Sequence, residues 1–576
     1  MEQFKNLFTP TKIGKMELKN RIVMLPMGTG FNETGDSIGD RFINYYVERA
    51  KGGVGLIMVS FTPIDVGSPL IPGLYHDRFI AGAHRLTDEV HAYGTKIAAQ
   101  LVTAYHLVPH EGAPPEAIAP SAVFNQMLRC IPRPITIEEI HRIVDEHGKV
   151  AWRAREAGFD AVELAVAGGY LLNRFLSPLT NKREDEYGGS FENRMRITLE
   201  IIESMRKAVG EDYPITCRIN VDEQMEGGYT IEDSKEIVCA LEKAGIQAIT
   251  FYTGWHESPV PTMQQSVPRG AFVYLAEKVK GWVNIPVIAT NRINDPVLAE
   301  TILAEGRADL IGMARAFLAD PELPNKAREG RLDEIVPCIA CSHCLAETLS
   351  AYRDWGKPIS IFCTVNPRLG KEAEYVIEPT ERVKKVFVVG GGPGGMEAAI
   401  IAALKGHKVT LYEKGSELGG RLLIASIPPY KDEIKVLIKS LIARMKKAGV
   451  EIKLNTEVGL KTVEEERPDV VVLATGAMTI IPDIPGIHGA NVATAEEVLT
   501  GHKEAGEVVL VVGGGMVGCE TAEFLAQRGK KVTIVEMLGR IASDVVSTYR
   551  PFFLTRLTKE GVRMETKAKV EEITEG

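Results

Sequence analysis

The segment AREAGFDAVELAVAGGYLL, residues 154–172, decides how the first half of this chain folds. A helix-patterned stretch ends at an Ala-Gly pair, and a short continuous apolar run follows it directly. The same order recurs in ERAKGGVGLIMVS (48–60), LEKAGIQAITFYTG (241–254) and ILAEGRADLIGMAR (302–315). Apolar runs of this length are typical of strands that are buried on both faces of a parallel sheet. The pattern therefore predicts alternating helices and parallel strands.

Four more apolar runs bring the number of expected strands to eight. They are RIVMLPM (21–27), KIAAQLV (96–102), PITCRIN (214–220) and PVIATN (286–291). Eight strand–helix units within about 330 residues are typical of a TIM (β/α)8 barrel. We therefore expect residues 1–335 to form such a barrel. An open doubly wound sheet is the alternative, although it does not naturally repeat the unit eight times.

The second half of the chain carries a different pattern twice. KKVFVVGGGPGGMEAAIIAALKGHKVTLYEK (384–414) reads as strand, glycine-rich turn, helix and strand, and EVVLVVGGGMVGCETAEFLAQRGKKVTIVE (507–536) repeats that order. This is the pattern of a dinucleotide-binding fold. We therefore predict an α/β chain in which Rossmann-like domains at 381–490 and 491–576 follow the barrel. Few strands follow the second motif, so we expect this last domain to be incomplete and the native chain to continue beyond Gly576.

Each glycine-rich turn is followed by an acidic residue at the end of the next strand. In the first motif these residues are Gly390, Gly392, Gly395 and Glu413. In the second they are Gly513, Gly515, Gly518 and Glu536. The glycines let the backbone approach a pyrophosphate at a helix N-terminus, and the acid accepts hydrogen bonds from ribose hydroxyls. A carboxylate repels a 2′-phosphate, so the second motif favours NADH over NADPH.

Four cysteines lie close together in the segment 336–380 that joins the barrel to these domains. They are Cys338, Cys341, Cys344 and Cys363. Four thiolates suit zinc or an iron–sulfur cluster. Structural zinc usually shows two separated pairs of ligands, so the three-plus-one spacing favours a 4Fe-4S cluster. Zinc and unligated thiols are the alternatives.

The ends of the expected barrel strands should surround the active site, because TIM-barrel sites lie at the carboxyl ends of the strands. The residues at these ends are Pro26, Met27, Gly28, Ser60, Gln100, Arg218, Arg292, Ala314 and Arg315. The set has several hydrogen-bond donors and few carboxylates. Arginines after the last two strands suit a phosphate-bearing ligand, and Arg218 suits the reduced, anionic end of a flavin. Salt bridges at the barrel rim are the alternative.

The composition excludes several other classes of protein. The chain has 576 residues, with 67 Lys and Arg against 76 Asp and Glu, and a net charge of −9. An acidic chain without a basic stripe is not expected to bind nucleic acid. No segment has the length and apolarity of a membrane span, and the N-terminus lacks the apolar core of a signal peptide. We therefore expect a cytoplasmic protein; the sequence does not indicate its oligomeric state.

Several segments of the barrel resemble the old yellow enzyme family. They are LFTPTKIGKMELKNRIVMLPM (7–27), FLSPLTNKREDEYGGSFENRMR (175–196) and ATNRINDP (289–296). Together with the cysteines, CTVNP (363–367) and the tandem nucleotide motifs, they resemble the multi-cofactor branch that includes bacterial 2,4-dienoyl-CoA reductase, 2-enoate reductase and trimethylamine dehydrogenase. The resemblance implies FMN in the barrel, a 4Fe-4S cluster at its edge and FAD in the first nucleotide domain.

A further motif supports FAD in the first nucleotide domain. ELGGR (417–421), which contains Gly420 and Arg421, is followed later by ATG (474–476). Both resemble motifs of FAD-containing domains of the pyridine-nucleotide disulfide reductase type. The second motif then corresponds to the NADH site of such domains.

The loop TGWHESPVPTMQQSVPRGAF (253–272) is similar to a loop of 2,4-dienoyl-CoA reductases. By this resemblance Tyr170 and His256 match the catalytic tyrosine and histidine. The chain departs from the family at Ala165 and Gly168, where most members carry two histidines and the amine dehydrogenases carry Tyr and His. The pair that grips an enone carbonyl in simple old yellow enzymes is therefore absent.

The resemblance implies an NADH-dependent reductase of activated C=C bonds. NADH gives two electrons as hydride, whereas a cluster carries one electron at a time. A flavin is therefore needed between NADH and the cluster, and another between the cluster and the substrate. Electrons would pass from NADH to FAD, the cluster, FMN and the substrate, with Tyr170 and His256 as proton donors. We expect a 2-enoyl-CoA, 2,4-dienoyl-CoA or aryl-CoA substrate. Free enoates and steroid or flavonoid enones are alternatives, as are an oxidative amine dehydrogenase and a non-catalytic electron-transfer flavoprotein.

Overall fold

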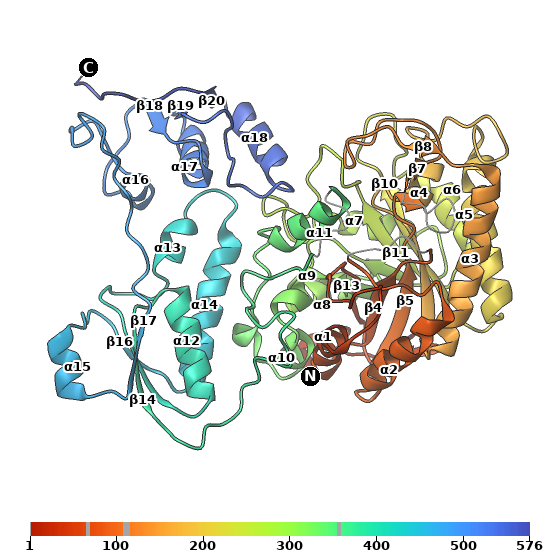
Figure 1. Cartoon of the computed structure of the whole chain (residues 1–576), viewed down its shortest axis with the longest axis horizontal. Helices are drawn as coiled ribbons and strands as arrows, with labels where there is room; N and C mark the ends of the chain where they lie inside the picture. The colour runs from red at the N-terminus through yellow and green to blue at the C-terminus, as the bar shows by residue number, and fades with distance from the viewer. Residues whose placement is uncertain (1, 65–69, 108–115, 354–358, 576) are drawn as a thin grey trace. The chain divides into compact units, whose positions relative to one another are not determined.

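The computed structural model describes residues 2–64, 70–107, 116–353 and 359–575. It divides the chain into two compact units (Figure 1). Unit 1 comprises Met1–Leu332 and His343–Tyr375, and unit 2 comprises Asp333–Ser342 and Val376–Gly576. Within the described ranges, no helix has the length and apolar character needed to cross a membrane.

Unit 1 contains a closed ring of eight parallel strands. The strands are β3 (Ile22–Met24), β4 (Leu56–Phe61), β5 (Lys96–Leu101), β9 (Ala161–Val166), β10 (Ile215–Asp222), β11 (Ile249–Thr253), β12 (Val287–Ala289) and β13 (Leu310–Met313). The ring is closed because β13 pairs with β3. The structure thus confirms the predicted TIM barrel and excludes an open doubly wound sheet.

Helices surround the ring and supply the crossover connections (Figure 1). The longer ones are α1 (Asp40–Lys51), α2 (Ile80–His91), α3 (Ile137–Glu156), α5 (Phe191–Val209), α6 (Ser234–Lys243), α7 (Val273–Lys280), α8 (Pro296–Ala304) and α11 (His343–Arg353). The shorter ones are α4 (Leu171–Leu176), α9 (Arg315–Ala319), α10 (Leu323–Arg328) and the 3-10 turns η1 (Glu2–Phe4), η2 (Asp77–Phe79) and η3 (Leu332–Glu334). Local sequence sets their ends, as at α3, where Thr136 and Glu139 form a reciprocal capping box.

Two small sheets accompany the barrel. β1 (Thr11–Ile13) and β2 (Met16–Leu18) form an antiparallel hairpin. β6 (His106–Leu107), β7 (Glu116–Ala119) and β8 (Arg133–Pro134) form a three-stranded sheet in the connection that follows β5. This connection is the longest insertion between a barrel strand and its helix, and it reaches the carboxyl end of the barrel.

The side chains inside the barrel change from apolar to polar towards the carboxyl ends of the strands. Met58, Ala98 and Ala161 belong to a buried apolar cluster. Two residues further along the same strands stand Ser60, Gln100 and Glu163, all buried. Since side chains two apart in a strand point to the same side, the apolar layer closes the core and the polar layer faces the barrel mouth.

Unit 2 contains two parallel sheets, each built on one glycine-rich motif. The first has β14 (Lys385–Val389), β15 (Lys408–Tyr412), β16 (Glu451–Lys453) and β17 (Val470–Leu473), in the order β16-β15-β14-β17. Its helices are α12 (Pro393–Leu404), α13 (Arg421–Ala425), α14 (Asp432–Lys447) and α15 (Leu460–Glu466). The second has β18 (Val508–Val512), β19 (Lys531–Glu536) and β20 (Arg563–Thr566), with α16 (Ala495–Thr500), α17 (Met516–Ala526) and α18 (Arg550–Lys559). These sheets confirm the predicted Rossmann-like arrangement.

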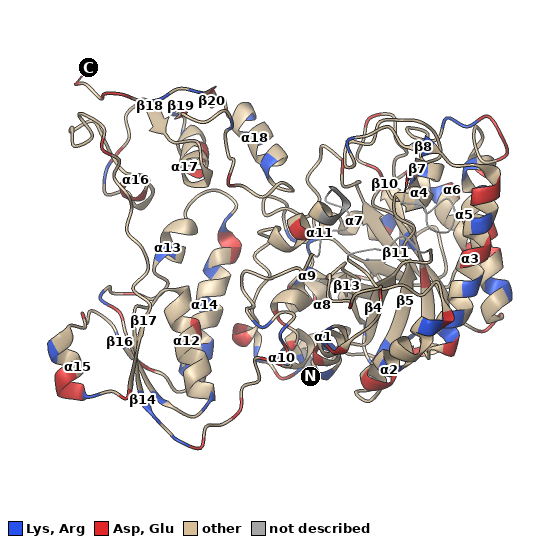
Figure 2. Ribbon diagram, viewed as in Figure 1, with Lys and Arg blue, Asp and Glu red and all other residues tan. Residues whose placement is uncertain are grey.

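Charged side chains of both signs are mixed on the outer helices. Figure 2 shows Lys and Arg beside Asp and Glu on α3 and on α15. Interspersed charges of this kind favour solubility and form pairs along a helix face.

Candidate active site

Tyr170 and His256 follow two strands of the barrel at its carboxyl end. After β9 the backbone turns through Gly168 and Gly169, whose φ angles are +69° and +80°. Only glycine adopts this left-handed region without strain. Tyr170 then caps the N-terminus of α4, and His256 lies three residues beyond β11.

The structure brings the two predicted residues together. The Tyr170 hydroxyl and His256 Nε2 are 3.4 Å apart, and the ring centroids are 5.5 Å apart. A Cβ atom at Gly168 would lie 3.4 Å from His256 Nε2 and 3.6 Å from the Tyr170 ring. The small residue that replaces the family's histidine at this position therefore leaves the space in which the phenol and the imidazole meet.

The imidazole of His256 is neutral at pH 7. Burial lowers its pKa to about 4, and the positive charges of Arg218 and Arg174 act in the same direction. Its Nδ1 atom is shielded from solvent and has no hydrogen-bond partner among the described residues. A neutral imidazole can donate or accept a hydrogen bond but holds no spare proton near neutral pH. This favours the phenol of Tyr170 as the proton donor of the pair.

A buried ion pair supports the two loops that carry Tyr170 and His256. The Arg174 guanidinium donates to the Gly169 carbonyl oxygen at 2.7 Å and to Glu257 Oε2 at 2.7 Å. Its carbon Cζ lies 4.8 Å from the centroid of the Trp255 ring. Glu257 Oε1 in turn accepts from the Met127 backbone N–H at 3.0 Å. These contacts join the loop before Tyr170, the loop that carries His256 and the insertion after β5.

Apolar side chains surround the Tyr170 ring. The buried members of this cluster are Leu70, Ile71, Val102, Tyr105 and Ala165, with Met127 and Leu128 packed against them. The Tyr105 and Tyr170 rings are 5.4 Å apart. The wall beside the phenol thus suits the apolar part of a substrate.

A second histidine in the barrel, His147, is fully buried. Its burial makes the free energy of unfolding of unit 1 depend on pH. His147 Nδ1 bonds to the Ile143 carbonyl oxygen at 2.7 Å, and burial lowers the pKa of His147 to about 4. The unfolded chain, with a pKa near 6.5, therefore takes up a proton between pH 6.5 and 4 that the folded chain does not. The stability of unit 1 should be complete above pH 6.5 and should fall as the pH drops towards 4.

Between pH 7 and pH 5, His147 alone should account for about 2 kcal/mol of this loss. Urea unfolding followed by tryptophan fluorescence at pH 7 and pH 5 measures the effect, because Trp152, Trp255 and Trp282 lie in unit 1. His147→Gln removes the titrating group and serves as the comparison. An equal pH dependence in this variant would show that His147 does not contribute.

The polar residues of the barrel mouth form a chain of hydrogen bonds. The Ser60 hydroxyl donates to Gln100 Oε1 at 3.0 Å, and Gln100 Nε2 donates to Glu163 Oε2 at 2.6 Å. Thr250 completes the chain by donating to Glu163 Oε1 at 2.6 Å. The prediction from sequence included Ser60 and Gln100 but missed Glu163 and Thr250. An acidic residue inside an otherwise apolar strand, AVELAV, was the signal for Glu163.

The predicted arginines lie after the last strands of the barrel. Arg292 follows β12 and donates to the Val267 carbonyl oxygen at 2.9 Å. Arg315 begins α9 after β13 and donates to the Met263 carbonyl oxygen at 2.7 Å. The Nη1 atom of Arg315 is buried without a partner in the described part of the chain. A buried donor of this kind fits a phosphate group.

Other predicted mouth residues occupy the turn after β3 and the start of α9. Pro26, Met27 and Gly28 follow β3, and Ala314 is the N-cap residue of α9. A Cβ atom at Gly28 would lie 3.3 Å from Leu70 Cβ, which is closer than most such contacts. Arg218 stands on β10, with Cζ 4.8 Å from the centroid of the Tyr252 ring.

The first nucleotide motif forms a tight turn in which Gly390 and Gly395 leave no room for a side chain. Gly390 has a φ of +115°, and a Cβ atom at Gly395 would lie 1.9 Å from the Gly390 carbonyl oxygen. Gly392 is the N-cap residue of α12. Glu413 accepts from the Gly391 backbone N–H at 2.7 Å. The backbone thus fits a pyrophosphate at the start of α12.

Two further residues predicted for the first nucleotide site lie at the start of α13. Gly420 has a φ of +52°, and Arg421 donates to the Ala477 carbonyl oxygen. Arg421 also pairs with Glu496. The side chain therefore joins the segment after β17 to α16.

The second motif repeats this geometry with one difference. Gly513 has a φ of +102°, and a Cβ atom at Gly518 would lie 2.0 Å from the Gly513 carbonyl oxygen. Gly515 caps α17, and Glu536 accepts from the Gly514 backbone N–H at 2.8 Å. Asp544, which the prediction from sequence missed, accepts from the backbone N–H of Met516 at 2.9 Å. A dinucleotide phosphate at this helix end would compete with that carboxylate.

The structure joins none of the four clustered cysteines in a disulfide bond. Cys344 and Cys363 both lie near the buried Tyr45, since their charges help to raise the pKa of its phenol, after burial as the largest cause. Ala340 and Ser342, which flank Cys341, have φ angles of +51° and +63°. In the ranges that the structure describes, no three His, Cys, Asp or Glu side chains form a group that holds a metal ion. The chemistry of four soft thiols fits an iron–sulfur cluster, and the cluster stays a prediction.

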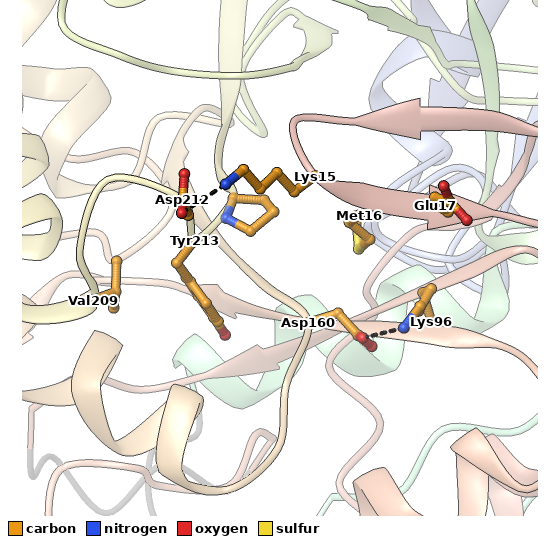
Figure 3. A pocket seen from close by; sticks show the side chains of 9 residues that line it. Lys15, Met16, Glu17, Lys96, Asp160, Val209, Asp212 and Tyr213 are labelled. Atoms are coloured by element: carbon orange, nitrogen blue, oxygen red, sulfur yellow. Dashed lines mark hydrogen bonds and ion pairs between the residues drawn. The ribbon is translucent and has the colours of Figure 1, made fainter.

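A cavity also lies at the opposite end of the barrel, but its charged side chains are paired with one another. It has a volume of about 580 Å³, and Figure 3 shows Lys15 against Asp212 and Lys96 against Asp160, each pair 2.7 Å apart. Asp160 also contacts His91 at 2.7 Å. These charges are already paired with one another, and TIM-barrel active sites lie at the other end.

Comparisons with known proteins agree with this architecture. Residues 6–334 match the NADH:flavin oxidoreductase / NADH oxidase family, and residues 384–576 match pyridine nucleotide-disulphide oxidoreductases. An NADH oxidase of Thermoanaerobacter brockii is 44% identical over 100% of this chain and 89% of its own length. A cinnamate reductase of Clostridium sporogenes is 39% identical over 94% of this chain and 84% of its own.

A solved structure of similar fold extends the likeness to nearly the whole chain. A 2-naphthoyl-CoA reductase in complex with 2-naphthoyl-CoA has a TM-score of 0.94 and is 34% identical, covering 99% of this chain and 89% of its own. The matches confirm the resemblance predicted from the sequence. This chain therefore belongs to the NADH:flavin oxidoreductase / NADH oxidase family and is an oxidoreductase with a C-terminal pyridine nucleotide-disulphide oxidoreductase region.

Proposed function

We propose that this chain uses NADH to reduce the activated C=C bond of an unsaturated acyl compound of the 2-enoyl-CoA, 2,4-dienoyl-CoA or aryl-CoA type. The observation that carries the proposal is the contact between the Tyr170 hydroxyl and His256 Nε2 beside an apolar wall. The similarity to a cinnamate reductase and a 2-naphthoyl-CoA reductase supports reduction of conjugated acyl compounds. Cinnamate is a free acid, so free enoates are the second candidate class.

The residues present fit the cofactors of such an enzyme. Gln100, Arg218, Arg292 and the unpartnered Nη1 of Arg315 would hold FMN at the barrel mouth. The turn at Gly390 would hold FAD, the turn at Gly513 would hold NADH, and Cys338, Cys341, Cys344 and Cys363 would hold a 4Fe-4S cluster. When bound, these groups convert the hydride of NADH into single electrons and back into hydride.

Tyr170 supplies the proton of the reaction. Hydride addition to one carbon of the C=C bond leaves negative charge on the substrate, and a proton must reach the adjacent carbon. A phenol hydroxyl carries a proton that it can give to a neighbouring carbon, so Tyr170 can act as a general acid. The neutral His256 hydrogen-bonds the phenol and stabilises the phenolate that forms. Arg174 holds both loops so that this contact persists.

Anaerobic substrate screening tests the proposal. Enoyl-CoA, dienoyl-CoA, aryl-CoA and free enoate compounds are each mixed with the enzyme and NADH, and loss of the substrate double bond is measured. Turnover of a CoA thioester in preference to its free acid supports the first candidate class, and the reverse preference supports the second. NADH-dependent flavin reduction without turnover of any of these compounds would overturn the proposed reaction.

Iron analysis tests the cluster. Anaerobically purified protein should contain about four iron atoms per chain. Cys344→Ser should abolish NADH-driven turnover, because the relay between the flavins is broken, but should leave reduction of the barrel flavin by an artificial donor intact. Cys130→Ser, which changes an isolated thiol, should leave the iron content unchanged. Stoichiometric zinc without iron would contradict the cluster.

Coenzyme preference tests the role of Glu536. Its carboxylate lies beside the glycine turn, where it accepts from the Gly514 and Leu538 backbone N–H groups. A negative charge here disfavours a 2′-phosphate, so kcat/KM should be higher with NADH than with NADPH. Glu536→Gln should narrow the difference, whereas Glu565→Gln on the neighbouring strand should not change it. A higher kcat/KM with NADPH in the unmodified enzyme would contradict the assignment.

A further inference from the structure

Glu163 is a carboxyl group in the interior of the barrel. Its side chain has no solvent exposure, and it stands on β9 beside Gln100 of β5. Met58, Ala98 and Ala161 of the apolar layer lie one step below it along the strands. Glu163 therefore marks the boundary between the apolar core and the polar mouth where FMN is proposed to bind.

Two hydrogen-bond donors face the carboxyl group of Glu163. Gln100 Nε2 and Thr250 Oγ1 each donate to one of its oxygens at 2.6 Å. Burial raises the pKa of Glu163 above its ordinary value, and the charge of Arg218 and these two bonds oppose that rise and support the ionised form. An ionised carboxylate accepts on both oxygens, as this geometry requires, whereas a protonated one must also donate.

The carboxylate fixes the orientation of Gln100. Because the Gln100 amide nitrogen donates to Glu163 and its oxygen accepts from Ser60, a rotated amide would place its oxygen against the carboxylate and lose that bond. Its second N–H remains for a ligand at the mouth. The same carboxylate offsets part of the positive charge that Arg218 presents there.

A purely structural role explains this arrangement poorly. A buried carboxylate destabilises a fold unless each of its lone pairs is matched, and apolar residues of similar size often serve the core equally well. The layer directly below uses such apolar residues. The charge is instead placed where Gln100 and Arg218, both proposed FMN ligands, converge.

We propose that Glu163 is a positioning residue of the FMN site, which orients Gln100, offsets the charge of Arg218 and thereby lowers the reduction potential of the bound flavin. The inference rests on the proposed FMN site. Added negative charge near a flavin disfavours its reduction, because the reduced form carries more negative charge. Removing the carboxylate should therefore raise the potential.

The test is a redox titration of the full chain after removal of its flavins and reconstitution with FMN alone. Glu163→Gln keeps the shape of the side chain but removes its charge. At a fixed solution potential it should increase the ratio of reduced to oxidised flavin by about tenfold, because the reduced flavin no longer faces a like charge. Glu163→Asp keeps the charge and should leave this ratio near that of the unmodified chain while weakening FMN binding.

Two further variants keep the test decisive. Thr250→Val withdraws one donor, so part of the Glu163 population takes up a proton, and the potential at pH 6 should rise in the same direction by less. Thr250→Val replaces Glu163→Gln in the test if Glu163→Gln fails to fold. Asp160→Asn, which removes a carboxylate at the opposite end of the barrel, should leave the potential unchanged.

The outcomes separate the inference from the proposed function. If the unmodified chain takes up no FMN, the proposed site is wrong and the inference falls with it. If FMN binds and the potential is the same in the unmodified chain, Glu163→Gln and Thr250→Val, the proposed site stands and the role of Glu163 is overturned.

Discussion

Replacing Tyr170 by phenylalanine is expected to slow the substrate-dependent reoxidation of the barrel flavin by about 10²–10⁴-fold, the usual effect of losing a general acid. Reduction of the enzyme by NADH should not change, because the nucleotide motif of unit 2 does not involve this residue. Rapid mixing of the NADH-reduced enzyme with substrate measures the step directly. The fold should tolerate the change, since the ring keeps its contacts with Tyr105 and the apolar wall.

Tyr105→Phe is the matched control for this prediction. It removes a hydroxyl from a neighbouring ring, 5.4 Å from that of Tyr170, without touching His256. Its effect on reoxidation should stay below about tenfold. Near-normal reoxidation in Tyr170→Phe would show that the proton comes from another group, and the proposed mechanism would then be wrong.

His256→Ala extends the argument to the pair. The imidazole is neutral, with a pKa of about 4, so it acts through its hydrogen bond with the phenol rather than as a second acid. Its loss should slow reoxidation by less than the loss of the phenol, because water can take its place. The double variant should lose less than the product of the two single effects if the residues act as a unit.

The barrel was predictable because its signal is local and repeated. Each strand is a short apolar run at a fixed place after a helix, and each of the eight predicted runs overlaps one of the eight strands of the ring. The two glycine-rich turns were predictable for a similar reason, since a positive φ at Gly390 or Gly513 leaves little choice of residue.

The contacts that support the site were not predictable in the same way. Arg174 and Glu257 are 83 positions apart, and neither residue type signals a partner until the loops after β9 and β11 meet. The hydrogen bond from Thr250 to Glu163 likewise depends on two strands that are not adjacent in the ring. The resemblance to 2,4-dienoyl-CoA reductases pointed to Tyr170 and His256, but it did not reveal what holds them in place.

Breaking the ion pair between Arg174 and Glu257 should strongly lower the stability of unit 1. Their side chains are 2% and 7% exposed, and the charged atoms are 2.7 Å apart. Arg174→Met leaves the carboxylate of Glu257 buried without its partner, and breaking a buried pair in this way costs about 3–5 kcal/mol. The free energy of unfolding of unit 1, measured in urea by tryptophan fluorescence, should fall by this amount.

The double variant Arg174→Met, Glu257→Leu tests the cause. It removes both charges, so no carboxylate is left without a partner, and it should recover much of the stability lost in Arg174→Met. It should not recover activity, because the bond from Arg174 to the Gly169 carbonyl oxygen, next to Tyr170, remains absent. A matched control is Arg183→Met, which breaks a more exposed pair with Asp185 and should cost less.

Comparing the unfolding free energy and the turnover rate of the two variants shows whether the ion pair stabilises the fold, orders the loops or does both. If Arg174→Met and the double variant are equally unstable, the loss comes from packing against Trp255 and not from the unpaired charge. If the double variant is stable and also fully active, Gly169 and Tyr170 hold their positions without Arg174. A stable but slow double variant, with an unchanged KM and a reduced kcat, is the expected result, because the pair then orders the loops that bring the phenol to the imidazole.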